Sequence, residues 1–204
     1  MLASASPRRL QLLERVGLTP DLLNPSDVDE LPHRRETPRA LSIRLAREKA
    51  ERALEMPLVQ ELGPNTFVLA ADTVVGLGRR ILPKAETMDQ ARDCLSLLSG
   101  RSHWVYSTVC LIAPGKKVST RCVETKVRFK RLSREDVDSY VASNEWRGKA
   151  GGYAIQGRAE AFVRLLTGSH SAVVGLPLYE TVHLLEGAGY PVFHSWMTAP
   201  QSEV

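Results

Sequence analysis

Hydrophobic positions along the 204-residue chain form blocks with a helical repeat and blocks with a strand repeat. In the helical blocks, apolar residues recur three or four positions apart, and proline or glycine marks the ends. The clearest block has charged residues on one side and, on the other, the stripe Leu41, Leu45, Ala46, Ala50, Ala53 and Leu54. We therefore predict helices over residues 7–17, 38–54, 88–98, 133–141 and 177–187.

The remaining blocks are either continuously apolar or strictly alternating, as strands are. Residues 67–75 are typical of a largely buried strand, and residues 103–112 and 118–130 predict an antiparallel pair with one solvated face. Residues 162–166 and 172–175 are predicted as two further strands, after a loop over 144–152. This order of elements predicts an α/β fold in which helices flank a mixed, strongly twisted sheet.

Length and composition are those of a chain that can bury a substantial core, since 43% of its residues are hydrophobic. We expect one globular domain over residues 1–204. The formal charge of +4 is modest and the basic residues are dispersed among 23 acids, which suits an anionic small molecule at least as well as nucleic acid. Because the charge is dispersed, we do not expect nucleic acid as a partner. We do not expect a membrane either, because no apolar stretch approaches membrane-spanning length.

Cys94, Cys110 and Cys122 are odd in number and lack metal-binding spacing, which indicates neither a disulfide framework nor a zinc site. Each is predicted to be a small buried hydrophobe. The N-terminus has no basic region followed by an apolar one, so we expect a cytoplasmic protein. The first predicted strand is very short, so either the chain starts there or residues are missing upstream.

The residues after that short strand combine three features that bind phosphate. Ser6 is placed to cap a helix that begins at Pro7, so free N–H groups and the positive helix end face the preceding turn. Arg8 and Arg9 lie in the same turn, and guanidinium groups match phosphate oxygens well. We interpret Ser4, Ser6, Arg8 and Arg9 as an anion site; the alternative is an ordinary capped helix with two solvated arginines.

Several polar residues interrupt apolar segments or end loops. Asp72 and Thr73 lie inside an apolar strand, and a buried carboxylate needs pairing, hydrogen bonds or a metal. Lys49 lies beside the apolar stripe of its helix, so its ammonium either snorkels to solvent or is directed at an anion. Lys84 follows in a short segment, and Gln156 ends a glycine-rich loop.

These segments include Leu-Ala-Ser-Ala-Ser-Pro-Arg-Arg at 2–9, Ala-Asp-Thr-Val-Val at 71–75, Gly-Lys-Ala-Gly-Gly-Tyr at 148–153, Ile-Gln-Gly at 155–157 and Val-Val-Gly-Leu-Pro at 173–177. In this order they resemble the Maf family of nucleoside triphosphate pyrophosphatases, also called septum formation inhibitor-like proteins. The resemblance covers nearly the whole chain. It implies a Maf/ITPase-like fold, an elongated α/β body with a cleft between two lobes, and a housecleaning hydrolysis of nucleoside triphosphates.

Within the family, the combination of Arg8, Thr73 and Gln156 resembles the subgroup that acts on dTTP and UTP. The 7-methyl-GTP subgroup carries different side chains at these positions. Whether modified pyrimidine nucleotides are also substrates is left open. The resemblance thus implies release of a nucleoside monophosphate and pyrophosphate from pyrimidine nucleotides.

Such hydrolysis needs charge neutralisation, an activated water and base recognition. The resemblance implies that the catalytic residues are Asp72, Lys84, Glu30 and Lys49. It implies that the substrate-binding residues are Ser4, Ser6, Arg8, Arg9, Thr73 and Gln156. Mg²⁺ or Mn²⁺ is the expected cofactor, with Glu30 and Asp72 as ligands, because such ions need few protein carboxylates when phosphates also bind them. From the residues alone, Glu30 also fits a plain acidic loop, and Asp72 fits a general base or a metal ligand; the family assigns Asp72 the base role.

Two positions depart from the family pattern. Pro83-Lys84-Ala85 stands where Gly-Lys-Pro is usual, and Ala172 replaces a polar residue. Both affect the expected rate and specificity more than the reaction type. Two alternatives remain open: a nucleotide-binding regulator of cell division whose hydrolysis is slow or incidental, and a pyrophosphatase of the 7-methyl-GTP type. Homodimers are common in the family, and a homodimer is an expectation here.

Overall fold

The computed structural model describes residues 1–198, so residues 199–204 of the expected domain lie outside the described part. Its strands are β1 (Leu2–Ala3), β2 (Val68–Leu77), β3 (Arg80–Leu82), β4 (Lys84–Ala85), β5 (Ser102–Ala113), β6 (Lys117–Phe129), β7 (Lys149–Ala150) and β8 (Val163–Thr167). Its helices are α1 (Pro7–Glu14), α2 (Pro38–Leu54), α3 (Pro57–Gln60), α4 (Met88–Leu98), α5 (Arg134–Ala142), α6 (His170–Val174), α7 (Leu178–Gly187) and α8 (Val192–Thr198).

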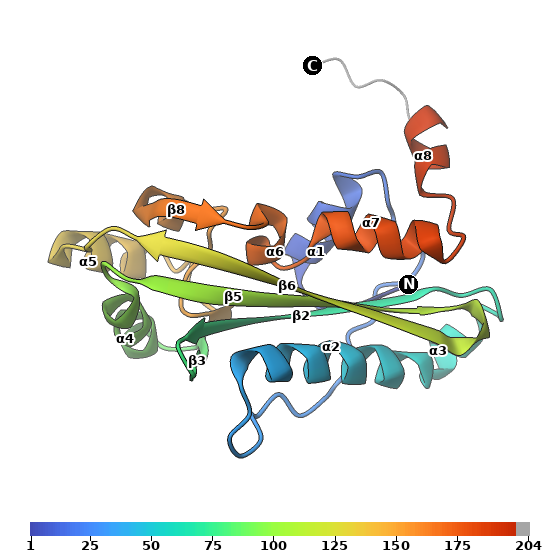
Figure 1. Ribbon diagram of the computed structural model, residues 1–204, viewed down its shortest axis with the longest axis horizontal. Helices are drawn as coiled ribbons and strands as arrows, with labels where there is room; N and C mark the ends of the chain where they lie inside the picture. Colours follow the sequence, from blue (N-terminus) through green and yellow to red (C-terminus); the bar gives the residue numbers. More distant parts are fainter. Residues whose placement is uncertain (199–204) are drawn as a thin grey trace.

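The central sheet has six strands in the order β1-β2-β5-β6-β8, with β3 also paired to β2 (Figure 1). β1 runs parallel to β2, and the other pairs of this sheet are antiparallel. β5 and β6 are the predicted hairpin, turned at Pro114–Lys116, and the alternation of β6 buries Thr125, Val127 and Phe129. The predicted mixed sheet flanked by helices is confirmed.

Helices cover both faces of the sheet (Figure 1). α2 lies along one face, where Ala46, Ala50 and Ala53 are completely buried against β2 and β5. These small side chains let the helix backbone approach the sheet closely. α1, α6 and α7 lie over the other face (Figure 1), which carries the larger apolar cluster. The close packing of α2 on β2 brings together the two elements that carry Lys49 and Asp72.

A second, two-stranded sheet lies beside the main one. β4 and β7 pair antiparallel, with Lys84 opposite Ala150 and Ala85 opposite Lys149. The sequence pattern predicted only a loop over residues 144–152, because a two-residue strand leaves no periodic signal. This small sheet ties the segment of Lys84 to the glycine-rich loop.

Side-chain caps begin the predicted helices α2 and α5. Thr37 accepts a hydrogen bond from the Ala40 N–H at the start of α2, and Ser133 and Asp136 form a reciprocal capping box at the start of α5. α1 ends at Glu14, short of the predicted end at residue 17, and its buried residues are Leu12 and Leu13.

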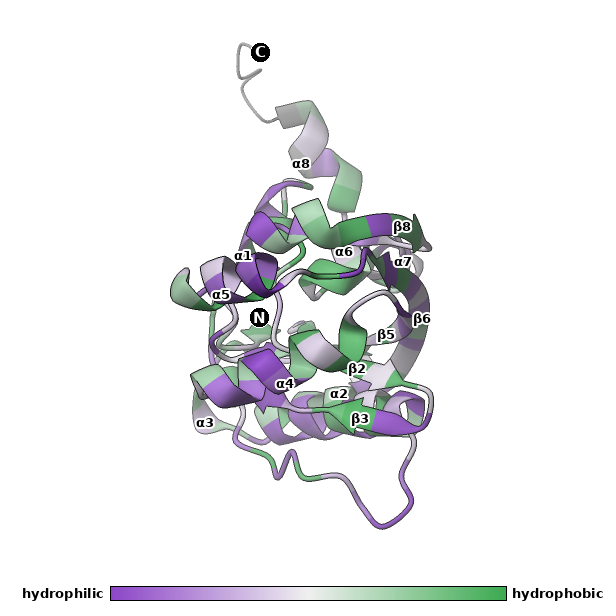
Figure 2. Ribbon diagram, turned by 90° about the vertical axis from the view of Figure 1, so that its left-hand side faces the viewer, coloured by the Kyte–Doolittle hydropathy of each residue, from purple (hydrophilic) through white to green (hydrophobic). Residues whose placement is uncertain are grey.

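One predicted element near the C-terminus is wrong, and one helix there was not predicted. Residues 172–175 belong to a helix, α6, and not to a strand. Ser169 caps this helix by accepting a hydrogen bond from the Ala172 N–H, and Gly175, with φ of 143°, ends it. The run Ala-Val-Val is too short for periodicity to separate helix from strand. The predicted helix over 177–187 is confirmed as α7, and a further helix, α8, follows it. α8 projects from the end of the body (Figure 2), and Trp196 Nε1 ties it to the Val16 carbonyl at 2.7 Å.

Two smaller expectations need correction. Cys94 and Cys110 are buried as predicted, but Cys122 is half-buried, since it lies on the solvated face of β6. The short helix α3, which begins at Pro57, was not among the predicted elements because four residues show no amphipathic repeat. In the described part of the chain, every helix is too short or too polar to cross a bilayer.

The glycine-rich loop generates a test of packing. Gly151 and Gly148 both have positive φ, at 70° and 62°, but a Cβ at Gly151 would lie 2.9 Å from Cγ1 of the buried, stiff Val75, whereas one at Gly148 would meet nothing within 4 Å. We expect Gly151→Ala to lower the free energy of unfolding by about 2–4 kcal/mol and Gly148→Ala by about 1 kcal/mol. Urea denaturation measures both, and equal losses would contradict the close packing of this loop on β2.

Candidate active site

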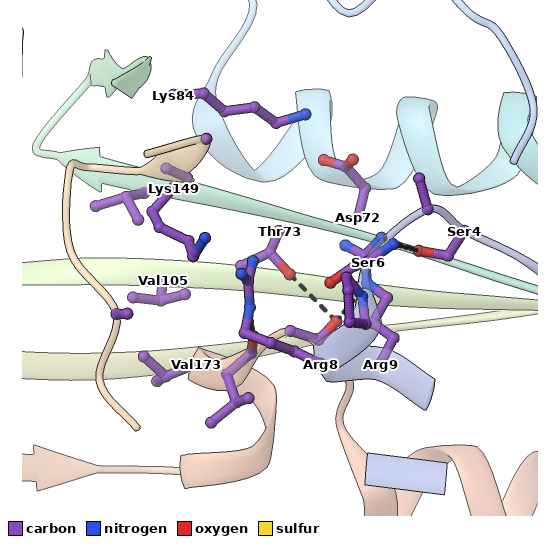
Figure 3. Close-up of a pocket in the computed structure, with 18 of the residues that line it drawn as sticks. Ser4, Ser6, Arg8, Arg9, Asp72, Thr73, Lys84, Val105, Lys149 and Val173 are labelled. Atoms are coloured by element: carbon purple, nitrogen blue, oxygen red, sulfur yellow. Dashed lines mark hydrogen bonds between the residues drawn. The ribbon is translucent and has the colours of Figure 1, made fainter. Parts of the chain in front are cut away.

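A cleft opens where part of the outer edge of β2 is unpaired in the described sheet. β1 pairs only with Leu69 and Ala70, and β3 pairs from Val75 onward, so residues 71–74 lie between them. Strand alternation turns Asp72 toward α2 and Thr73 toward the opposite face. Both side chains line one cavity of about 380 Å³ (Figure 3). The gap in the strand edge therefore lets one cleft reach side chains from both faces of the sheet.

All ten candidate residues named from the sequence line this cavity. They come from the N-terminal turn, the loop before α2, α2 itself, β2, β4 and the glycine-rich loop: Ser4, Ser6, Arg8, Arg9, Glu30, Lys49, Asp72, Thr73, Lys84 and Gln156. The cavity is also lined by cations that the sequence reasoning missed, Arg147 and Lys149. Their position after α5, in a predicted loop, carried no signal that they would turn into the cleft. The fold thus assembles the candidate site, while the role of each residue stays a prediction.

Lys49 lies between the two candidate carboxylates. Its Nζ donates to Asp72 Oδ1 and to Glu30 Oε1, each at 2.6 Å, and Lys84 Nζ donates to the other oxygen of Glu30. Lys49 is 8% exposed and Asp72 is 4% exposed. The ammonium of Lys49 is therefore directed at anions and does not snorkel to solvent. This pairing supplies the countercharge that the buried Asp72 needs.

The ionisation of Glu30 is governed by its two lysine partners. Partial burial acts to raise the pKa of Glu30, but the hydrogen bonds and positive charges of Lys49 and Lys84 lower it to about 2. Because the pKa is lower than the ordinary value of 4.5, these contacts stabilise the fold fully above that pH and less as the pH falls toward 2. Glu30 therefore stays an anion at neutral and mildly acidic pH.

The N-terminal turn is organised around Ser4. Ser6 occupies the cap position of α1, but its hydroxyl makes no capping hydrogen bond within residues 1–198, which corrects the predicted side-chain cap. Instead, the Ser6 N–H donates to Ser4 Oγ at 3.2 Å, and Arg9 Nη1 donates to the same oxygen at 3.0 Å. The Ser4 oxygen thus accepts two hydrogen bonds, and its own O–H hydrogen is left to donate to an anion.

Both arginines are held by the C-terminal end of α6. This contact was not predicted from the sequence. Arg9 Nε donates to the Gly175 carbonyl at 2.9 Å, and Arg8 Nε donates to the Val174 carbonyl at 3.4 Å. The last carbonyls of a helix have no partner inside the helix and accept readily from guanidinium groups. The predicted strand over 172–175 would not present such an end, so the wrong element concealed this contact.

Within residues 1–198, neither Arg8 nor Arg9 forms a salt bridge with a carboxylate. Burial, and then repulsion from Arg9, lower the pKa of Arg8. Burial also lowers the pKa of Arg9, against the attraction of Asp72 and Glu30. Guanidinium groups nevertheless stay protonated in proteins. A bound anion would relieve this repulsion, so the pair favours a phosphate ligand.

Thr73 is held by contacts on both sides. Its Oγ1 lies 2.8 Å from Oγ of Ser107, its register partner on β5, and 3.4 Å from the Gly175 carbonyl. Ser107 is completely buried, so this hydroxyl pair fixes the Thr73 side chain. The Gly175 carbonyl also accepts from Arg9, and one acceptor therefore links Thr73 to the anion-binding turn.

Uncharged side chains of the glycine-rich loop also line the cleft. Gln156 is exposed there and follows Tyr153, whose hydroxyl lies 2.8 Å from Nε2 of the buried His103. Burial lowers the pKa of His103 to about 4 and raises the pKa of Tyr153, so both are neutral at pH 7. An amide beside a neutral wall suits a neutral ring with hydrogen-bonding edges.

Glu30 and Asp72 fit a divalent cation. One ammonium bonds both carboxylates at 2.6 Å, so their oxygens flank a position that already holds positive charge. Within residues 1–198, no three or more His, Cys, Asp or Glu side chains are grouped to hold a metal. A cation would therefore take these two carboxylates and complete its shell with phosphate oxygens and water, as Mg²⁺ prefers.

Known proteins resemble the chain over nearly all of its length. The family described as Maf-like protein matches residues 1–188. A dTTP/UTP pyrophosphatase of Mesorhizobium japonicum is 60% identical over 199 residues, with 98% of this chain and 96% of that protein covered. A dTTP/UTP pyrophosphatase of Rhodopseudomonas palustris strain HaA2 is 59% identical with the same coverage. A solved nucleoside-triphosphatase / dITP/XTP pyrophosphatase from Mycobacterium abscessus covers 64% of this chain and 74% of its own, at 17% identity and a TM-score of 0.35, too low to establish a common fold.

The buried pair of Lys49 and Asp72 generates a test of stability. Lys49→Met leaves Asp72 buried without its countercharge, so we expect the free energy of unfolding to fall by about 3 kcal/mol. The double variant Lys49→Met/Asp72→Asn has no buried charge left without a partner. We expect its loss in free energy of unfolding to be smaller than the sum of the losses in the two single variants, by at least about 1 kcal/mol. Urea denaturation at pH 7 measures all three variants. Strictly additive losses would show that the two side chains are not coupled.

Proposed function

This chain belongs to the Maf family, and we propose that its single domain hydrolyses dTTP and UTP to the nucleoside monophosphate and pyrophosphate. The observation that carries the proposal is the charge of the cleft, which is lined by six lysine or arginine side chains and two carboxylates. The positive excess suits a triphosphate. The two carboxylates suit the activation of water, which a protein that only binds nucleotides would not need. Both Maf relatives are named dTTP/UTP pyrophosphatase, which supports the choice of dTTP and UTP.

The phosphate chain binds across the N-terminal turn. Arg8 and Arg9 neutralise its oxygens, the Ser4 hydroxyl donates to it, and the first N–H groups of α1 face it from the helix start. Lys84 extends this positive wall from β4. Because the carbonyls of α6 already hold the guanidinium groups, little reorganisation is needed when the substrate arrives.

Asp72 acts as the general base. The oxygen of a water bonds to the α-phosphorus while the bond from that phosphorus to the bridging oxygen breaks, and pyrophosphate leaves. Asp72 takes the proton that the water loses. Lys49 orients the Asp72 carboxylate through its 2.6 Å hydrogen bond and carries the countercharge. Glu30 holds Lys49 and Lys84 in place on the other side.

Glu30 and Asp72 are the residues that would hold Mg²⁺ or Mn²⁺. Such an ion, when bound, supplies Lewis-acid stabilisation of the phosphate oxygens and lowers the pKa of a bound water. In the arrangement described here, Lys49 and Lys84 neutralise the same two carboxylates. Charge on these carboxylates is therefore balanced before a nucleotide binds.

Gln156 and Thr73 recognise the base, with Arg8 contributing. A uracil or thymine edge presents carbonyl acceptors and one N–H donor, and an amide offers both a donor and an acceptor. The neutral wall around Tyr153 is compatible with an uncharged ring. Selection against other bases then arises where buried polar groups would be left unpaired.

The reaction itself is tested by pyrophosphate release from a panel of nucleoside triphosphates with Mg²⁺ or Mn²⁺. We expect turnover concentrated on dTTP and UTP, and a loss of at least about 100-fold in Asp72→Asn, because asparagine keeps the shape but accepts no proton. Thermal melting of the variant checks that it folds. Activity confined to 7-methyl-GTP would keep the reaction and overturn the substrate, and unchanged turnover in Asp72→Asn would overturn the base.

Base recognition is tested by Gln156→Glu. A carboxylate has no donor for the O4 of uracil or thymine, but it accepts from the amino group of cytosine. We expect the ratio of kcat/KM for dTTP over dCTP to fall by about tenfold or more. An unchanged ratio, with normal folding, would show that Gln156 does not contact the base.

A further inference from the structure

Lys149 is a cation of the cleft to which neither the sequence motifs nor the reaction scheme gives a role. It lies on β7, opposite Ala85 of the short β4 strand. Further backbone hydrogen bonds brace this segment: Gly148 N–H donates to the Ala85 carbonyl at 2.9 Å, and Gly151 N–H donates to the Pro83 carbonyl at 3.0 Å. The backbone that carries Lys149 is therefore fixed on both sides.

The ammonium of Lys149 has a neutral partner. Its Nζ donates to the Arg147 carbonyl at 2.8 Å, and within residues 1–198 it forms no ion pair with a carboxylate. An ammonium has three donors, so two remain for a ligand. Figure 3 shows the side chain reaching into the cleft, with its nitrogen turned toward the end of Arg8. Two cations thus face each other across the cleft.

The surroundings of Lys149 oppose its charge. Burial, and then repulsion from Arg8, lower the pKa of Lys149, against a weaker attraction from Glu86. The other two lysines of the cleft differ, because Lys49 and Lys84 are both paired with Glu30. Positive charge at Lys149 and Arg8 is left without an acidic partner in the described cleft, which is the arrangement of a site whose countercharge arrives with the ligand.

Arg147 lines the same cleft but is engaged elsewhere. Its guanidinium lies 5.2 Å from the centre of the Trp146 ring, and its Nε donates to Asn144 Oδ1 at 3.3 Å. These contacts hold the arginine against its own loop. Its backbone carbonyl, by contrast, orients Lys149. Of the two cations that the sequence reasoning missed, Lys149 is the one free to meet a ligand.

We propose that Lys149 is a substrate-binding residue that donates to the phosphate chain, on the part that leaves as pyrophosphate. This inference rests on the proposed function. A pyrimidine base is neutral and would not balance two facing cations, whereas the terminal phosphates would. Charge also builds on the leaving pyrophosphate as the bond breaks, so a fixed ammonium there favours the transition state.

Lys149→Met tests the proposal, with Lys117→Met as the matched control because Lys117 is exposed in the β5–β6 hairpin and does not line the cleft. Calorimetry measures the binding of inorganic pyrophosphate and of dTMP to the folded proteins, and neither titration requires turnover. We expect Lys149→Met to weaken pyrophosphate binding about 10- to 100-fold and to leave dTMP binding within about twofold. Lys149→Arg, which keeps the charge, should retain most of the pyrophosphate affinity.

The outcomes separate the two proposals. Weaker dTMP binding with unchanged pyrophosphate binding would place Lys149 at the base and overturn the inference, as would equal affinities in Lys149→Met and the wild type. If the wild type binds pyrophosphate through Lys149 but hydrolyses no nucleoside triphosphate, the proposed function fails and the binding role of Lys149 stands. If Lys149→Met does not fold, loss of pyrophosphate affinity in Lys149→Gln supports the proposal and retention contradicts it.

Discussion

The acidic half of the cleft depends on one ammonium group. Lys49, carried by α2, is bonded at 2.6 Å both to Asp72 on β2 and to Glu30 in the preceding loop. Without it, the buried carboxylate of Asp72 would lack its countercharge beside the half-buried Glu30, which costs several kcal/mol. The alanines of α2 bring the helix close enough to the sheet for this contact to form. The close packing of α2 on the sheet and the chemistry of the site are therefore parts of the same arrangement.

The basic half of the cleft is organised by neutral partners. The carbonyls of Val174 and Gly175 orient Arg8 and Arg9, and the carbonyl of Arg147 orients Lys149. A carbonyl fixes the direction of a cation without neutralising it, so the charge stays available for phosphate. Lys49 and Lys84 are paired with acids on one side, and carbonyls hold cations on the other. This division is what the proposed function requires of one small cleft, which must both activate water and bind a polyanion.

Long elements were predictable from the sequence because many residues contribute to the periodic pattern of each of them. The apolar stripe of α2 and the alternation of β6 each predicted the right element. Asp72 was identifiable because an acid in an apolar strand needs a partner. The end of α6 and the strand β7 were not predictable. α6 has five residues and β7 has two, which are too few to show a period. Both elements also act on the site through backbone groups, which leave no pattern in the sequence. The role of Lys149 was hidden for the same reason, because only the pairing of β7 with β4 turns it into the cleft.

The central claim is that water attacks the α-phosphorus beside Asp72 while the basic half of the cleft holds the departing pyrophosphate. Hydrolysis of dTTP in water labelled with heavy oxygen, followed by mass spectrometry of both products, tests this most directly. The label should appear in the nucleoside monophosphate, and the pyrophosphate should be unlabelled. Label in the pyrophosphate would place the attack at the β-phosphorus. Release of a nucleoside diphosphate and labelled phosphate would place it at the γ-phosphorus. Either result would contradict the arrangement of the site.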